Sequence, residues 1–546
     1  MSQKQHLNFD DLVSRREFMK DLGLAGTVAL LAFTGGCEQI IEIIENRPMR
    51  KNVDNLGPGD PMVVAYKAAV TAMKNLYTTN PTDQRNWVNQ ALIHNNHCPH
   101  GNWYFLPWHR AYLLYFERIC RKYSGNLDFA LPYWNWTSSP TVPSVFWDGT
   151  SGSCAAPCPP TSVSSSANPL FDCSRAITSS DAVSSAFVGI PVMESILQEP
   201  NFFNFASYQA VGQRDFAGYG LLEETPHNHV HGFIGGYMGA YCSPMDPVFW
   251  THHCMIDACW VNWNITRGNP NTNDNNWLTF SLVDFVDENN NPVNIPIVDT
   301  LLYPILAYQY EPSQMGNTVA QVPTPRSAEA SLGTKSATIF PFASAFAAAS
   351  DPQGLPSGRK LSKSEAKTLV NFLKKGAPVK LEYTSRYELV RALNVEVGRP
   401  ITASIKIEPN KVRAALDIQS RNRLYLTVAG ITMPKRSDEF VRVFLNKPDA
   451  STETPLSDPH YAGSFAFFVD EHGMHGNTAP NAGFVVDTTE ALRKLNQVAA
   501  LSENVEVQLV SMLYDHRTAE GEQFTLQKLE LGIAPPPNVT KLKLSM

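Results

Sequence analysis

Histidine is concentrated in two short windows of this chain. Nine of the 14 histidines lie within residues 94–117 and 227–257, and none lies between residues 254 and 459. Imidazole is a nitrogen ligand suited to copper, zinc, iron and nickel. Two dense clusters of this ligand therefore predict two metal ions that share one site.

The second window predicts three nitrogen ligands from two helices. His227 and His231 are four residues apart, so on a helix they lie on the same face. Pro226 suits the opening of that helix. His253 lies in a second apolar run, where Asp246 is expected to cap the helix and Pro247 to take its first position.

The first window offers a similar set. His100 is expected in a loop, His109 follows Pro107 at a helix start, and either His94 or His97 ends the preceding helical run. A site of three plus three histidines without a carboxylate is the composition expected for paired copper that binds dioxygen. Zinc hydrolases and non-haem iron sites usually add a carboxylate or a water.

In these two windows the chain resembles the type-3 copper family, which includes tyrosinases, catechol oxidases (polyphenol oxidases) and molluscan haemocyanins. The run F-L-P-W-H-R-A-Y-L-L-Y-F-E at 105–117 resembles the first copper signature. H-N-H-V-H at 227–231 and D-P-V-F-W-T-H-H-C-M-I-D at 246–257 resemble the second. The resemblance spans roughly residues 60–270. It implies two copper ions, one held by His94, His100 and His109 and the other by His227, His231 and His253.

The remaining histidines of the windows are given other roles. The family pattern I-H-x-x-x-C-x-H favours His94 over His97. His252 is read as a packing or hydrogen-bonding residue, because adjacent helical residues cannot aim at one ion. His229 faces away from the ligands and is expected on the surface.

Cys98 stands two residues before His100, which is the C-x-H spacing of fungal tyrosinases and molluscan haemocyanins. The resemblance implies a thioether bond between Cys98 and His100, which would restrain the imidazole ring. The alternatives are a buried free thiol and a disulfide.

The resemblance implies hydroxylation of monophenols to o-diphenols and oxidation of o-diphenols to o-quinones by dioxygen. A phenol has a pKa near 10 and must lose its proton to bind copper, so a general base is needed for hydroxylation. In family members with this activity an asparagine and a glutamate hold a water. Here Asn228 follows His227, and the plant-like P-H-N sequence selects Glu223 over Glu224. The alternative is a helix-surface amide and two first-turn acids.

Two further positions are assigned to the substrate pocket. Gly232 follows His231 and leaves the entrance without a side chain there. Phe249 lies four residues before His253, so it is expected to pack against that ligand's ring. The alternative functions are a catechol oxidase with little monophenolase activity and an oxygen carrier of the haemocyanin type. A structural zinc protein is disfavoured, because cysteine-rich tetrahedral sites are absent from the sequence.

The chain of 546 residues is long enough for two or more domains. Residues 38–325 are expected to form a mainly α-helical oxidase domain, a four-helix bundle that holds the binuclear copper site. Residues 326–379 are expected to be a linker with a short helix. Alternating apolar patterns in residues 380–546 predict a β-sandwich.

The C-terminal region resembles, more loosely, the domain that shields the copper site of plant polyphenol oxidases. It is therefore expected to act as a lid. Its aromatic run F-A-F-F-V-D-E-H-G-M-H-G offers Phe467, Phe468 or Met474 to occupy the substrate pocket. His472 and His475 with Met474 are also candidate copper ligands.

The first 37 residues predict a bacterial twin-arginine export signal, so a periplasmic or extracellular location is expected. Cys37 is a candidate lipid-anchor site.

Of Cys154, Cys158 and Cys173, one must be free or pair elsewhere. The net charge of −7 gives no electrostatic case for nucleic acid, and the expected partners are small phenols and dioxygen. The sequence does not indicate an oligomeric state.

Overall fold

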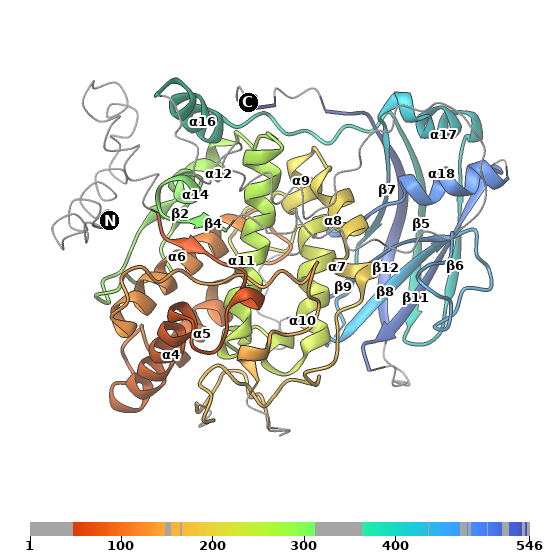
Figure 1. The fold of residues 1–546 in the computed structure, drawn as a ribbon. Helices are drawn as coiled ribbons and strands as arrows, with labels where there is room; N and C mark the ends of the chain where they lie inside the picture. The colour runs from red at the N-terminus through yellow and green to blue at the C-terminus, as the bar shows by residue number, and fades with distance from the viewer. Residues whose placement is uncertain are drawn as a thin grey trace, which may run out of the picture.

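A computed structural model describes residues 47–147, 154–163, 166–311, 363–434, 436–469, 478, 482–499, 501–515, 523–537 and 541–542. The predicted export signal with Cys37, most of the predicted linker, and Met474 with its neighbouring histidines lie outside the described residues. The described chain forms two parts (Figure 1). We call residues 47–311 the helical domain and residues 385–534 the C-terminal sheet domain.

Five helices carry or flank the two histidine windows. They are α4 (Pro61–Thr79), α5 (Trp87–His97), α6 (Phe105–Ser124), α10 (Asn228–Ile234) and α11 (Val248–Val261). Helix α6 packs against both α4 and α11. Its end is set by Gly125, which adopts the left-handed conformation that closes many helices. The mainly helical fold of this region agrees with the sequence.

Shorter elements complete the helical domain. The helices are α7 (Ser185–Val188), α8 (Ile190–Leu197), α9 (Phe202–Ala206), α12 (Asn275–Thr279), α13 (Ile297–Thr300) and α14 (Tyr303–Leu306). The short strands are β1 (Met49–Arg50), β2 (Ser281–Leu282), β3 (Ile295–Pro296) and β4 (Gln309–Tyr310). Helix α16 (Lys363–Lys375) follows the undescribed stretch and packs its Leu369 and Leu373 into the core of the helical domain.

The helix before α10 starts earlier than the sequence predicts. It begins at Leu221, and residues Glu223–His227 form a π-helical turn with Pro226 inside it. Proline has no N–H for the regular α-helical hydrogen bond, which accounts for a local change of winding here. Helix α11 begins at Val248, one residue later than expected, and Asp246 Oδ1 accepts a hydrogen bond from its backbone N–H.

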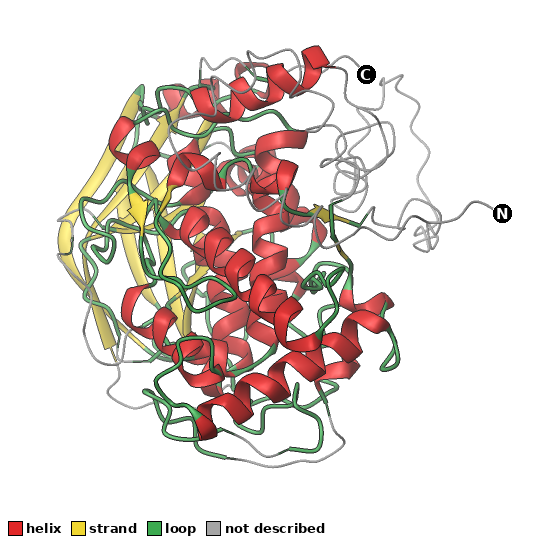
Figure 2. Cartoon of the chain, turned by 90° about the vertical axis from the view of Figure 1, so that its left-hand side faces the viewer, coloured by secondary structure: helices red, strands yellow, loops and turns green. Residues whose placement is uncertain are grey.

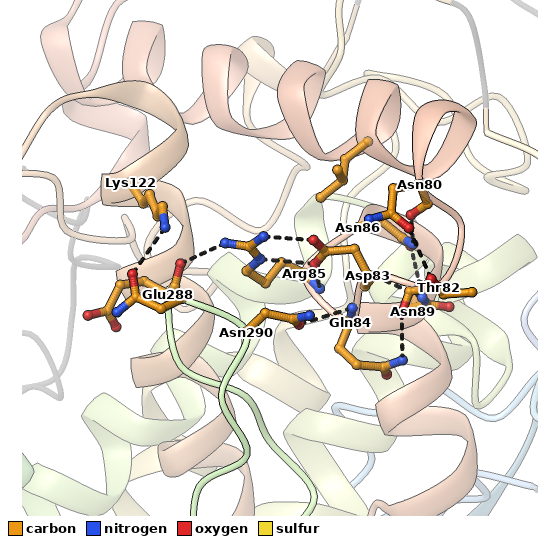
Figure 3. A network of polar contacts seen from close by, with 12 residues as sticks. Asn80, Thr82, Asp83, Gln84, Arg85, Asn86, Asn89, Lys122, Glu288 and Asn290 are labelled. Carbon is orange, nitrogen blue, oxygen red and sulfur yellow. Dashed lines mark hydrogen bonds and ion pairs between the residues drawn. The ribbon is translucent and has the colours of Figure 1, made fainter.

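A polar network fixes the start of α5, the helix that ends in the first histidine window (Figure 3). Asn86 caps α5 by accepting a hydrogen bond from Asn89 N at 2.8 Å. Arg85 pairs with Asp83 and donates to Glu288 O at 3.0 Å. The loop at 288–290 therefore holds the N-terminus of α5 in place.

The C-terminal sheet domain contains two four-stranded antiparallel sheets. One has the order β10 (Gly483–Asp487), β7 (Arg423–Ala429), β12 (Gln523–Ala534), β5 (Ser385–Glu396). The other has the order β6 (Ile401–Lys406), β11 (Asn504–Leu513), β8 (Glu439–Leu445), β9 (Tyr461–Ala466). Helices α17 (Pro409–Leu416) and α18 (Thr489–Val498) join them at one end (Figure 1). Alternate side chains of both sheets share one apolar core.

The sheets lie against one side of the helical domain, as Figure 2 shows. Strand β9 contacts α10 and the π-helical turn before it, which places this edge of the sheet domain beside the second histidine window.

Two disulfide bonds connect loops within the helical domain. Disulfides join Cys154 to Cys173 and Cys158 to Cys242, so the odd cysteine of the loop cluster pairs outside it. None of the helices in the described residues is long and apolar enough to cross a membrane.

Candidate metal centre

Six histidine rings form two facing triangles in the buried interior. His94, His100 and His109 have ring centroids 5.4–5.5 Å apart. His227, His231 and His253 have ring centroids 4.4–5.6 Å apart. The triangles meet where His109 stacks on His253 at 4.3 Å. The structure thus brings all six sequence-predicted ligands together, from α5, the loop before α6, α6, the π-helical turn, α10 and α11.

Hydrogen bonds turn these rings so that one nitrogen of each faces the centre. Backbone carbonyl oxygens accept from Nδ1 of three rings: Tyr241 O for His94 at 2.6 Å, Phe105 O for His109 at 2.8 Å and Met238 O for His231 at 2.6 Å. Because Nδ1 then carries the proton, Nε2 offers its lone pair.

Side chains orient two further ligands. Glu223 Oε1 lies 2.9 Å from His100 Nδ1, and Asn228 Oδ1 lies 2.8 Å from His227 Nδ1. The Nε2 atoms of His94, His100, His109 and His227 are buried and have no hydrogen-bond partner among the described residues. Four buried, unpartnered nitrogens in groups whose ligand atoms lie within 4.8 Å of one another would be costly unless a metal ion bound them. The donor set fits two copper ions.

Burial keeps the ligand histidines neutral. It lowers the pKa of His109 and His231 to about 3, and it lowers the pKa of His94, His100, His227 and His253 well below the usual value. Neighbouring histidines add to the effect in most of these cases. A neutral imidazole is the form that binds a metal, so these rings need not lose a proton first.

The other histidines of the two windows lie in different surroundings. His97 is nearly half exposed, with 48% of its side chain accessible, and pairs with Asp284 at 3.3 Å. The first triangle therefore contains His94 and not His97. His252 is buried beside the second triangle, but its Nδ1 accepts a hydrogen bond from Trp136 Nε1 at 3.2 Å. The proton of neutral His252 then sits on Nε2, so that nitrogen has no lone pair for a metal.

His229 differs from the expectation that it lies on the surface. It faces away from the ligands, but it is completely buried because the C-terminal sheet domain covers it. Its Nδ1 lies 2.6 Å from Tyr514 Oη, its Nε2 lies 3.0 Å from Ser464 Oγ, and its ring stacks on Phe187 at 3.7 Å. The pattern of one helix cannot reveal this, because the two hydrogen-bond partners, Tyr514 and Ser464, lie more than 200 residues away in the sequence.

The two glutamates before His227 point in different directions. Glu223 is completely buried, and its carboxylate accepts from Gly101 N at 2.9 Å and Ser207 Oγ at 2.6 Å in addition to its contact with His100. Burial raises its pKa well above the usual value, although these two hydrogen bonds oppose the shift. Glu224 instead accepts a hydrogen bond from Val485 N at 3.0 Å, in the C-terminal sheet domain.

Asn228 joins a ligand to the C-terminal sheet domain. Its side-chain nitrogen donates to Ala466 O at 2.8 Å while its oxygen faces His227. Cys98 is a buried cysteine outside any disulfide, two residues before His100.

Phe468 lies over the metal centre. Its ring centroid is 4.6 Å from those of His100 and His231, 5.8 Å from that of His227 and 5.1 Å from that of Tyr241, on which it stacks. Phe467, the other described candidate, packs instead inside the C-terminal sheet domain against Phe484 and Phe524. Adjacent residues of an extended segment point to opposite sides, which separates the two rings.

The two residues that the sequence assigns to the substrate pocket, Phe249 and Gly232, lie in different environments. Phe249 lies with its ring centroid 4.2 Å from that of His253. Gly232 lies against the C-terminal sheet domain, where a Cβ would collide with Ser437 O and the Tyr514 ring. Sequence reasoning missed Tyr241 and Met238, which act through backbone carbonyls and so leave no side-chain signal.

The fold and the site define a protein with a binuclear, histidine-bound metal centre under a covering sheet domain. Residues 69–266 match the family model described as the common central domain of tyrosinase. A tyrosinase of Hahella sp. (strain CCB-MM4) is 30% identical over 273 residues, which cover 45% of this chain and 54% of that protein. A chloroplastic polyphenol oxidase of Vitis vinifera is 26% identical over 501 residues, covering 85% of this chain and 72% of that protein.

Solved structures share the fold over most of the chain. Latent aurone synthase (polyphenol oxidase) from its natural source has a TM-score of 0.58 at 22% identity, with 90% of both chains covered. Latent apple tyrosinase has a TM-score of 0.54 at 18% identity, covering 89% of this chain and 97% of that one. The chain spans about half the length of the first two curated relatives, 54% and 50%. It carries a tyrosinase central domain, which it shares with tyrosinases and polyphenol oxidases.

Proposed function

We propose that this protein is a copper-dependent phenol oxidase that uses dioxygen to convert o-diphenols to o-quinones and monophenols to o-diphenols. The observation that carries the proposal is the convergence of six buried histidines, five of which use Nδ1 in a hydrogen bond and so leave Nε2 free for metal. Two copper ions held there would supply the binding and reduction of dioxygen.

Hydroxylation of monophenols requires a base that the oxidation of diphenols does not. We assign this role to Asn228 and Glu223, which would hold a water beside the incoming phenol. Burial raises the pKa of Glu223, which suits a group that takes up a proton. Asn228 donates one of its two side-chain N–H groups to Ala466 O, so displacement of this segment would free that donor for a water.

A catechol oxidase with little monophenolase activity is the second candidate. It is favoured by the contacts of Glu223, whose two oxygens already face His100, Gly101 and Ser207. In that case the carboxylate would only orient His100. Hydroxylation of tyrosine by the purified chain, assayed after the C-terminal sheet domain has been displaced or cleaved, distinguishes the two candidates.

The C-terminal sheet domain is proposed to hold the enzyme in a latent state. Phe468 supports this, because its aromatic ring lies where a phenol ring would have to approach the two coppers. Latency would be relieved when the domain is displaced or cleaved. A haemocyanin-like oxygen carrier would bind dioxygen at the same six histidines without oxidising phenols, and the oxygen-uptake assay below distinguishes it.

Other predictions remain proposals. They are the four-helix bundle of α5, α6, α10 and α11, the β-sandwich of the C-terminal sheet domain, twin-arginine export with a lipid anchor at Cys37, and the Cys98–His100 thioether. Forming that bond breaks the Cys98 S–H bond and one His100 ring C–H bond and releases two protons and two electrons, which dioxygen takes up. Mass spectrometry of the Cys98–His100 peptide, two mass units lighter if the bond is present, tests it.

The experiment that tests the function is a copper titration of the metal-free chain followed by oxygen-uptake assays. We expect two copper ions per chain, a dioxygen-dependent absorption band and faster uptake with catechol than with tyrosine. Binding of zinc with no uptake after copper addition would contradict the proposal.

A further inference from the structure

The segment 208–220 belongs to the helical domain but is folded into the C-terminal sheet domain. Phe216 and Tyr219 are 2% and 0% exposed, and they belong to the apolar core built mainly by the two sheets. The Tyr219 ring stacks at 5.0 Å on Phe484 of β10 and lies 5.1 Å from the Phe216 ring. The two domains therefore share this segment as part of one core.

The backbone of the same segment is bonded on both sides. Toward the metal centre, Ala217 N and Gly218 N both donate to Gly101 O, at 2.8 and 3.0 Å. Toward the sheet domain, Tyr219 N donates to Gly483 O at 2.9 Å. Gly101 has a φ of +57°, and a Cβ there would collide with the Phe216 ring. The turn after His100 thus fits this segment only as glycine.

Tyr219 also reaches the residue that lies over the metal centre. Its hydroxyl donates to Phe468 O at 3.0 Å, while the Phe468 ring lies 4.6 Å from the His100 ring. The other end of the connection is Gly101 N, which donates to the Glu223 oxygen that also faces His100 Nδ1. Tyr219 is therefore bonded directly to Phe468, and the two residues before it, Ala217 and Gly218, bond the turn that positions His100.

We infer that Tyr219 is a positioning residue that couples the seating of Phe468 to the orientation of His100. Closure of the pocket and metal binding then strengthen each other, because a coupling free energy between two sites is reciprocal. The inference rests on the proposed function for the identity of the metal, but it concerns only the link between metal binding and closure.

The test compares the full-length chain with and without copper(I), under nitrogen, by hydrogen exchange of the backbone amides near Phe468. Phe467 N donates to Glu439 O at 3.4 Å and Val469 N to Ser437 Oγ at 2.9 Å, both within the C-terminal sheet domain, so the exchange of these two amides reports how firmly the segment that carries Phe468 is seated. In the wild type we expect copper to slow their exchange about fivefold or more, the lower end of typical coupling.

Tyr219→Phe removes the hydroxyl and keeps the ring on Phe484. We expect the slowing by copper to fall below about twofold and copper affinity, measured against a competing chelator, to fall about threefold to tenfold, the range of one net hydrogen bond. Tyr425→Phe is the matched control, since the Tyr425 hydroxyl donates across the same domain interface to Glu199, away from the histidines. It should change exchange equally with and without copper.

Three outcomes would overturn the inference. Copper could bind to the wild type without slowing exchange at Phe467 and Val469, which shows no coupling. The Tyr219→Phe chain could keep the full slowing, which shows that coupling takes another route. The control could lose the slowing to the same extent, which shows a general effect of domain docking. A wild type that binds no copper refutes the proposed function itself, and with it the coupling.

Discussion

Asn228 and Ala466 join the metal centre to the C-terminal sheet domain through one amide side chain. Asn228 Nδ2 donates to Ala466 O at 2.8 Å, and its Oδ1 lies 2.8 Å from Nδ1 of the ligand His227. The amide that we assign to hold a water for hydroxylation is thus occupied by a backbone carbonyl when the domain is closed. Closure can therefore suppress hydroxylation by engaging Asn228 as well as by placing Phe468 in the pocket.

His109→Ala and His253→Ala test the ligand set. Each change removes one of the two stacked rings at the junction of the triangles, and we expect loss of the dioxygen-dependent absorption band and of all oxidation. Metal content and oxygen uptake with catechol measure the effect. His97→Ala is the control and should keep both, because His97 lies nearly half exposed beside Asp284. Catechol oxidation by either the His109→Ala or the His253→Ala variant would contradict the assignment of these histidines as metal ligands.

Asn228→Ala and Glu223→Gln test whether these two residues provide the general base for the hydroxylation of monophenols. We expect hydroxylation of a monophenol to fall about 10²–10⁴-fold, the usual contribution of a general base, while oxidation of an o-diphenol falls much less. Steady-state rates with tyrosine and catechol on the same preparation measure the difference. Glu224→Gln is the control, since Glu224 faces Val485. Equal losses on both substrates would show that the residues only orient His227 and His100.

Phe468→Ala tests whether the Phe468 ring blocks the metal centre, without removing the C-terminal sheet domain. The ring lies 4.6 Å from His100 and His231, so its loss should raise turnover and lower the KM for bulky phenols. Phe467→Leu is the control because Phe467 packs within the sheet domain. The point change is a cleaner test than truncation, which would expose Phe216 and Tyr219. Unchanged kinetics in the Phe468→Ala chain would contradict a blocking role.

Gly232→Ala tests how tightly the C-terminal sheet domain docks on α10. A Cβ at this position would collide with Ser437 O and Tyr514, so we expect the sheet domain to dock less tightly. Limited proteolysis should cut the variant faster, and turnover should rise. Gly239→Ala is a control, because nothing lies within 4 Å of a Cβ there. Proteolysis at the wild-type rate would show that the interface adapts to the methyl group.

Asp257→Asn tests the buried ionic network of the helical domain. Asp257 pairs with Arg110 at 2.6 Å and Arg50 at 3.3 Å. Burial raises the pKa of this carboxyl, but Arg110, Arg50 and two tyrosine hydroxyls outweigh burial and lower it from 3.8. Removing the negative charge takes away the ionic partner that the structure describes for buried Arg110, while Arg50 keeps Glu117, so the free energy of unfolding should fall by about 3–5 kcal/mol.

The pH dependence of that loss follows from the lowered pKa. The stabilisation by ionised Asp257 is fully present above its unfolded pKa of about 3.9 and is lost as pH falls through the lower folded value. Urea unfolding of the metal-free chains should therefore show a constant gap between wild type and variant above about pH 5 and a shrinking gap below about pH 4. A gap that widens in acid would contradict the network.

The sequence by itself predicted, to a large extent, the fold class and the six histidines that the fold brings together. His227 and His231 share a face because a helix repeats every 3.6 residues, and His253 and His109 follow recognisable helix starts. Alternation of apolar residues indicated the C-terminal strands. These are local properties, which is why they can be read along the chain.

Only the tertiary structure decided the rest. It separated Phe468 from Phe467, buried His229 under Tyr514, and directed Glu223 to His100 and Glu224 to Val485. Each outcome depends on a partner far away in sequence or on a backbone carbonyl. Such contacts are set by how two domains pack, and no local spacing of residue types contains that information.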